Sequence, residues 1–179
     1  MKRLLVVVDM QNDFVTGCLG TQEARAIVPN LVNFVNLFDG DVIYTQDTHY
    51  DKRVLYDEDT NSYIESYMDM QEGKRLPVPH CIDGTDGWKI IPELNPKWTL
   101  KKVTFGSDSL GKIIKEEVYD EVHFVGVCTG ICVISNAVIA KAFNPEARIV
   151  IHKDLCACVT PESHEIALKA MQTLQMDIE

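Results

Sequence analysis

Five short segments of apolar and β-branched residues recur along the chain, and they constrain the fold more than any other feature. They are Leu4–Val8, Val42–Thr45, Thr99–Val103, Val122–Val127 and Arg148–His152. Their apolar residues are continuous and do not alternate with polar ones, which is typical of strands buried on both faces of a parallel sheet. The pattern therefore predicts five strands in a mostly parallel central sheet.

Helical patterns separate these strands. The predicted helices are Ile27–Phe38 with Asp39-Gly40 as a stop signal, a short one at Leu110–Ile114, Ile131–Phe143 ended by Asn144-Pro145, and one opened by Pro161 and capped by Thr160. Alternating strands and helices predict an α/β protein with three layers, α/β/α.

Length, charge and cysteine content narrow the class of protein. A chain of 179 residues fits one domain over residues 1–179. A formal net charge of -10 argues against a nucleic-acid partner. No apolar stretch approaches the roughly 20 residues of a membrane span, and the run Leu4–Val8 is too short for a signal peptide. Six cysteines without an export signal indicate reduced thiols, so we expect a cytoplasmic protein.

Residues 50–98 differ from the rest of the chain. They are rich in Tyr, Asp, Pro and Gly, and show no periodic pattern beyond a turn of helix near Tyr63–Met70. An irregular connection of this length inside a compact domain is usually functional. We expect this segment to contribute to a site.

Residues that can carry chemistry follow the predicted strands. They are Asp9, the pair Asp47 and His49, Lys102, and the pair Cys128 and Cys132. Ligand and catalytic sites of open α/β sheets gather beyond the carboxyl ends of the strands. These residues are therefore the first candidates for a shared site.

The two cysteines of Gly126-Val-Cys-Thr-Gly-Ile-Cys132 have different predicted positions. Cys132 falls in the first turn of a helix, where backbone N–H groups lower the pKa of a thiol and can hold an oxyanion. Cys128 precedes the turn, and its backbone N–H can point into the same space. Two small buried residues or a zinc pair are the alternatives. Cys156-Ala-Cys158 is expected to be structural.

Asp9 and Lys102 are candidates for a buried ion pair. A carboxylate directly after an apolar strand is costly to bury unless it is paired or used, and beside a thiol it can serve as a base. A salt bridge or strand cap is the other interpretation. Strand alternation places only one of Lys101 and Lys102 inward, where a lysine would stabilise a thiolate.

Asp47, His49 and His80 are candidate metal ligands. Asp47 and His49 lie two residues apart in an extended segment, on the same side, and form a plausible half-site. His80, in the irregular segment, could complete the site.

Taken together, these residues resemble the motifs of the cysteine hydrolases of the isochorismatase-like fold, and within them the nicotinamidase branch. Asp9 with Asp13-Phe14 resembles the first motif of that family. Lys102 with Phe105 resembles the lysine motif, and Gly126–Cys132 the nucleophile motif. The similarity runs from residue 4 to about residue 140.

The resemblance implies a site and a reaction. Asp9, Lys102 and Cys132 would be catalytic, and the N–H groups of Cys128 and Cys132 would hold the oxyanion. Phe14 would pack against the substrate ring. A divalent metal ion, zinc before iron or manganese, would bind Asp47, His49 and His80, with Glu72, Glu65 or water as a fourth contact. The implied reaction converts nicotinamide to nicotinate and ammonia through a cysteine thioester, in NAD salvage.

Two features qualify the resemblance, and two other functions stay open. Gly130 stands where the family has an aspartate, and the family often has a cis peptide bond at the position of Val127–Cys128.

Another amidase of the family, acting on a carbamoyl or ureido substrate, would keep Asp9, Lys102 and Cys132. A non-catalytic protein using Cys128 and Cys132 as a thiol switch is the alternative from another class. The expected partner is a small-molecule amide, with no nucleic acid or membrane, and a homo-oligomer is left open.

Overall fold

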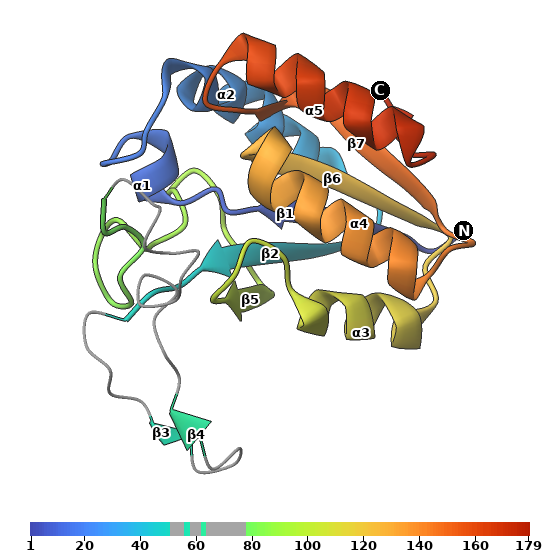
Figure 1. Ribbon diagram of the computed structural model, residues 1–179, viewed down its shortest axis with the longest axis horizontal. Helices are drawn as coiled ribbons and strands as arrows, with labels where there is room; N and C mark the ends of the chain where they lie inside the picture. The colour runs from blue at the N-terminus through green and yellow to red at the C-terminus, as the bar shows by residue number, and fades with distance from the viewer. Residues whose placement is uncertain (51–55, 58–61, 64–77) are drawn as a thin grey trace.

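The computed structural model describes residues 1–50, 56–57, 62–63 and 78–179, and a six-stranded sheet forms its centre (Figure 1). The strand order is β5-β2-β1-β6-β7-β8, and every neighbouring pair is parallel. The strands are β1 (Arg3–Val8), β2 (Asp41–Asp47), β5 (Thr99–Lys102), β6 (Glu121–Val127), β7 (Arg148–Ala157) and β8 (Asp177–Ile178). The five predicted strands are confirmed, whereas β8 was missed because two residues show no periodicity.

Helices cover both faces of this sheet and complete the three predicted layers (Figure 1). Helix α2 (Gln22–Leu37) packs on one face, and α3 (Asp108–Glu117), α4 (Ile134–Phe143) and α5 (Pro161–Thr173) pack on the other. Thr160 caps α5 as predicted, in a reciprocal capping box with Ser163. A four-residue helix, α1 (Asn12–Val15), was not predicted.

The apolar continuity of the strands has a direct structural cause. In β1, Leu4, Val6 and Val8 pack with α3, α4 and α5, whereas Leu5 and Val7 pack with α2. All five side chains are buried because both faces of the sheet are covered.

The irregular segment at residues 50–98 is only partly described. It contains a short antiparallel pair, β3 (Tyr56–Asp57) and β4 (Ser62–Tyr63), which was not predicted. Beyond Tyr63, the expected turn of helix at Tyr63–Met70 lies outside the described residues. The described part from residue 78 to residue 98 has no helix or strand, as expected, and isolated bridges tie it to His49 and Gln11. That the chain forms a single domain stays a prediction.

The sheet order explains how distant segments reach one site. Strands β2 and β6 flank β1 on opposite sides, and β5 flanks β2, so four carboxyl ends meet at one edge of the sheet. Asp9 follows β1, Asp47 ends β2, Lys102 ends β5 and Cys128 follows β6. Among the described helices, none has the length and apolar character needed to cross a membrane.

Candidate active site

The buried ammonium group of Lys102, at the end of β5, contacts three of the candidate residues that were predicted at other places in the chain. Its Nζ atom lies 2.8 Å from Asp9 Oδ2, 3.2 Å from Asp47 Oδ1 and 3.7 Å from Cys132 Sγ. Lys101 is exposed and pairs with Asp83 at 3.2 Å. The expectation that only one of the two lysines points inward is therefore confirmed.

Asp9 is held by the neighbouring strand. Its backbone has a positive φ of 50°, and the Thr45 hydroxyl donates a hydrogen bond to Asp9 Oδ1 at 2.7 Å. Thr45 is the β2 register partner of Val8, the residue directly before Asp9. The sequence alone does not predict this role, because Thr45 lies inside a strand where a β-branched residue is ordinary.

Cys132 lies in a π-helical turn, η3 (Thr129–Val133), which continues into α4. The prediction that a helix begins here is confirmed, although its first turn is wider than an α-helical one. Cys128 is the residue before the turn, and the Val127–Cys128 peptide bond is cis, as the resemblance implied.

The electrostatics of Cys132 correct one expectation. Burial raises the pKa of its thiol well above the ordinary value; Lys102 opposes this shift and Asp9 adds to it. The prediction that the helix start lowers the pKa of Cys132 was wrong, because in a fully buried site the loss of hydration outweighs the effect of the helix.

Asp9 and Lys102 are shifted in ways that favour proton transfer. Burial raises the pKa of Asp9, against the opposing charge of Lys102. Burial by itself lowers the pKa of Lys102, but the negative charges of Asp9, Cys132 and Asp47 raise it on balance. Lys102 therefore stays charged, while Asp9 becomes a stronger base than an exposed carboxylate.

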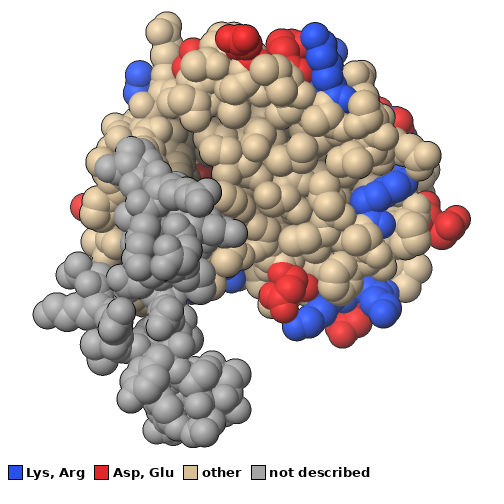
Figure 2. Space-filling view, in the orientation of Figure 1, with Lys and Arg blue, Asp and Glu red and all other residues tan. Residues whose placement is uncertain are grey.

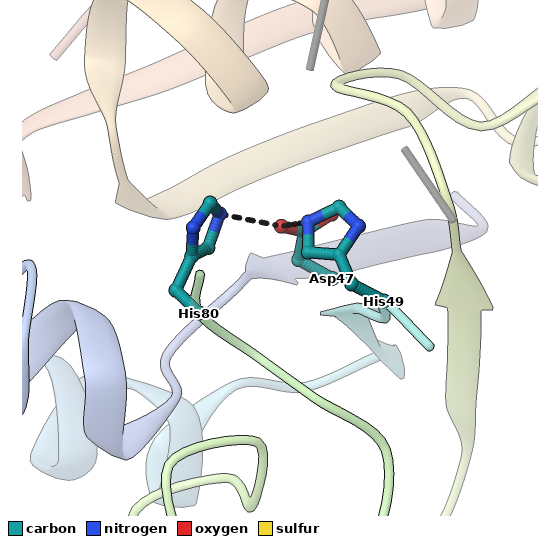
Figure 3. A group of neighbouring side chains, drawn as sticks. All are labelled: Asp47, His49 and His80. Atoms are coloured by element: carbon teal, nitrogen blue, oxygen red, sulfur yellow. Dashed lines mark hydrogen bonds and ion pairs between the residues drawn. The ribbon is translucent and has the colours of Figure 1, made fainter. Parts of the chain in front are cut away.

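Asp47, His49 and His80 point toward one another beside this group (Figure 3). Asp47 Oδ2 lies 2.9 Å from His49 Nε2 and 3.5 Å from His80 Nε2. All three residues are buried, and one ligand atom from each falls within 4.8 Å of the others. No other group of three or more potential ligands occurs within the residues that the structure describes.

The donor set fits a divalent metal ion. His80 Nδ1 lies 2.9 Å from the Val78 carbonyl oxygen, an acceptor, so Nδ1 carries the proton in the neutral ring. His80 then directs the lone pair of Nε2 toward Asp47 Oδ2, and two acceptors facing each other require a cation or proton between them. Two imidazoles and one carboxylate are a common set for zinc and iron.

Asp47 is fixed by a residue that sequence reasoning missed. The Gln11 side chain accepts a hydrogen bond from Asp47 N at 2.7 Å and donates to Asp47 O at 2.9 Å. It also donates to the carbonyl of Trp88 at 2.7 Å, which ties the irregular segment to the site. The signal was an amide side chain two residues after Asp9, near the end of a buried strand.

A cavity of about 240 Å³ joins the thiol and the metal-like group. Its walls include Cys128, Cys132, Asp47 and His80, and the apolar side chains Phe14, Leu19, Phe105, Ile131 and Val159. Ring centroids of Phe14 and His80 are 5.5 Å apart. Phe14 is therefore placed where a substrate ring could contact it. The other predicted metal contacts, Glu65 and Glu72, lie outside the described residues.

Comparisons with known proteins point to one family. A model of the isochorismatase domain matches residues 3–178. The chain is 33% identical over 187 residues to PncA of Bacillus subtilis, described as an uncharacterized isochorismatase family protein, covering 94% of this chain and 93% of that protein.

Solved structures of two amidases are also similar. The nicotinamidase/pyrazinamidase PncA from Bacillus subtilis has a TM-score of 0.79 and 27% identity, with 99% of each chain covered. N-carbamoylsarcosine amidase from Thermoplasma acidophilum has a TM-score of 0.78 and 25% identity, with 100% of this chain and 96% of that chain covered.

Proposed function

The chain belongs to the isochorismatase family, and from that premise we propose that this hydrolase, an amidase, converts nicotinamide to nicotinate and ammonia with Cys132 as the nucleophile. The observation that carries the proposal is the position of Lys102. Its ammonium group contacts Asp9, Cys132 and Asp47, so the thiol, its base and the metal-like group belong to one site.

The first half of the reaction forms a thioester. Asp9 takes the proton of the Cys132 thiol, which shares the Lys102 ammonium group with it, and the thiolate sulfur attacks the carboxamide carbon. Lys102 balances the negative charge that Asp9 and Cys132 share. Backbone N–H groups of Cys128 and Cys132 stabilise the oxyanion of the tetrahedral intermediate. Asp9 then gives its proton to the departing nitrogen, and ammonia leaves.

The second half regenerates the thiol. Asp9, ionised again, accepts a proton from water as the water oxygen attacks the thioester carbon. The carbon–sulfur bond then breaks, nicotinate leaves, and Cys132 regains a proton from Asp9. The raised pKa of Asp9 suits a group that must accept and donate a proton in turn.

Asp47, His49 and His80 would hold a divalent metal ion, which when bound supplies a Lewis-acid contact that orients the substrate. We propose zinc first, with iron or manganese as alternatives. The pyridine ring of nicotinamide would fit against Phe14 between the metal group and Cys132. The apolar cavity walls support an aromatic substrate. A cytoplasmic location and a role in NAD salvage belong to the same proposal.

Ammonia release from nicotinamide tests the assignment. We expect Cys132→Ala to lose activity by at least about a thousandfold, because the covalent route is removed. Cys128→Ala should stay within about tenfold of wild type, because it keeps the backbone N–H. Activity in Cys132→Ala, or its loss in a folded Cys128→Ala protein alone, would contradict the roles given to the two cysteines.

Metal content gives a second readout. We expect about one divalent ion per chain in purified protein, its loss with chelator, and its loss in His80→Ala. His164→Ala is a matched control, because His164 hydrogen-bonds to Thr129 and not to Asp47. Full nicotinamide turnover in metal-free protein would argue against a metal site that orients the substrate.

The second candidate is an amidase acting on a carbamoyl or ureido substrate, and the similarity to N-carbamoylsarcosine amidase favours it. Comparing kcat/KM for nicotinamide with that for N-carbamoyl amino acids separates the two. A higher value for the carbamoyl substrate would replace nicotinamide while keeping the chemistry of Cys132.

A further inference from the structure

Two cysteines whose thiols have no role in the proposed reaction lie next to each other where β6 and β7 end. Val127 and Ala157 are register partners in these parallel strands, and Cys128 and Cys158 are the residues that follow them. Neighbouring strands are roughly 4.8 Å apart, within the Cα separations of roughly 4.4–6.8 Å that native disulfides span. Each thiol also shifts the pKa of the other: Cys158 raises the pKa of Cys128, and Cys128 lowers the pKa of Cys158.

We propose that Cys128 and Cys158 are a redox pair that forms a reversible disulfide at the edge of the active-site cavity when it meets hydrogen peroxide. This site differs from the thiol switch considered from the sequence, which paired Cys128 with Cys132. It does not depend on the proposed substrate.

The contacts of the other nearby thiols favour this pairing. Cys132 Sγ accepts a hydrogen bond from Lys102 Nζ at 3.7 Å. The buried thiol of Cys156 donates to the Phe124 carbonyl oxygen at 3.7 Å, so it is engaged elsewhere. Among the described residues, Cys128 and Cys158 have no third ligand that would make them a metal site.

The surroundings of Cys158 stabilise a thiolate. The neighbouring Cys128 thiol, the Ser163 side chain and the backbone N–H groups of Gly130 and Val159 outweigh burial and lower the pKa of Cys158 to about 5. A thiolate is the form that attacks peroxide, so Cys158 is expected to react first. Cys128, whose thiol stays protonated, would then act as the resolving cysteine.

Cys158 is 4% exposed and lies in the wall of a surface groove, which is the route for a small oxidant. The residue lines a groove of about 400 Å³ between η3 and α5, whose walls also include Gly130, Ser163 and Ala167. A Cβ atom at Gly130 would lie 3.6 Å from Cys158 Sγ and 3.3 Å from Ala167 Cβ, so glycine at this position leaves room beside the sulfur. The surface over α4 next to this groove is largely uncharged, with charged side chains mainly at its rim (Figure 2).

The reaction balances with peroxide as the oxidant. The Cys158 thiolate attacks one peroxide oxygen, the O–O bond breaks, and the sulfur becomes a sulfenic acid as hydroxide leaves and takes up a proton to form water. The Cys128 sulfur then attacks the Cys158 sulfur, and a second water leaves with the thiol proton. Two thiols lose two electrons in total, one peroxide is consumed, and a dithiol reductant reverses the step.

Peptide mapping of the folded protein tests the pair. Trypsin places Cys128 and Cys132 in residues 116–141, and Cys156 and Cys158 in residues 154–169. The variant carrying Cys132→Ala and Cys156→Ala therefore leaves one possible link between these two peptides. After treatment with equimolar peroxide and alkylation of the remaining thiols, we expect the two peptides to be linked in most of the protein. Dithiothreitol should release them.

Single further substitutions identify the two sulfurs that form the link. Adding Cys128→Ser or Cys158→Ser to this variant should abolish the link, with circular dichroism confirming that each protein is folded. Fragmentation of linked peptides from wild-type protein gives the same assignment if a variant folds poorly. The proposal is overturned if Cys128 and Cys158 are both alkylated after peroxide, if Cys158 proceeds to the sulfinic acid without a link, or if the wild-type link joins Cys128 to Cys132.

Discussion

Lys102 buries its ammonium group between the carboxylates of Asp9 and Asp47, and all three side chains are almost completely buried. Although burial favours the neutral acid, Lys102 together with His49 and His80 holds the pKa of Asp47 well below its usual range. Breaking a buried ion pair by removing one partner is costly because the other charge stays dehydrated. Lys102 is therefore expected to stabilise the fold in addition to its role at Cys132.

Lys102→Met tests this residue, because it keeps much of the side-chain length and removes the charge. We expect the free energy of unfolding of the metal-free protein to fall by about 3–5 kcal/mol, measured by urea denaturation. We also expect the variant to lose ammonia release. Lys101→Met is the matched control and should change the free energy of unfolding by less than about 0.5 kcal/mol. Equal stability of the two variants would show that the buried charges do not depend on Lys102.

At the scale of elements, the end of β6 requires glycine. Gly126 has a φ of 114°, and a Cβ atom there would lie 2.2 Å from the carbonyl oxygen of Val8 in β1. The two strands could not keep their register with a larger residue at this position, since the Val8 oxygen is backbone and cannot move aside. Because Asp9 and Cys128 directly follow these strand ends, the close approach also determines their separation.

Gly126→Ala is therefore expected to reduce the free energy of unfolding by more than about 3 kcal/mol, from the clash and the strained backbone together. Gly84→Ala is the control, because Gly84 also has a positive φ, of 81°, but no atom lies within 4 Å of its Cβ position. Gly84→Ala should reduce the free energy of unfolding by only about 1–2 kcal/mol. Urea denaturation of both variants measures the difference, and similar costs would contradict the clash.

At the scale of the whole molecule, a histidine pair connects β6, β7 and α2 away from the active site. His123 Nδ1 lies 3.0 Å from His152 Nε2, their rings are stacked, and the Phe34 ring centroid lies 4.5 Å from that of His152. Burial and the neighbouring His123 lower the pKa of His152 to about 4. The folded protein therefore favours neutral His152, whereas the unfolded chain protonates it near pH 6.5.

This difference predicts a pH dependence of stability with a definite sign. Between pH 6.5 and pH 4 the unfolded state binds more protons at His152, so the free energy of unfolding falls as the pH falls. We expect His152→Gln to reduce this fall by about 1 kcal/mol, since solvent screens a partly exposed ring, measured by urea denaturation at pH 7 and pH 4.5. Parallel curves for wild type and variant would exclude His152 as the titrating group, since the carboxylates titrate in both proteins.

The sequence by itself determined the layers of the fold and the candidate residues. Apolar periodicity is a local property, so strands such as Leu4–Val8 and helices such as Pro161–Thr173 could be found without coordinates. The convergence of Asp9, Asp47 and Lys102 could be anticipated because parallel strands end at one edge of the sheet. Gln11 and Thr45 were missed because a hydrogen-bonding partner on another strand leaves no local pattern.

Only the tertiary structure decided how these residues affect one another. The helix start predicted a lowered pKa for Cys132, but the thiol is buried, and loss of hydration reverses the direction. Likewise, the spacing of Cys128 and Cys132 suggested a pair, whereas the register of β6 and β7 places Cys158 beside Cys128. Burial and strand register depend on residues far apart in the chain, so neither could be read from either cysteine's own segment.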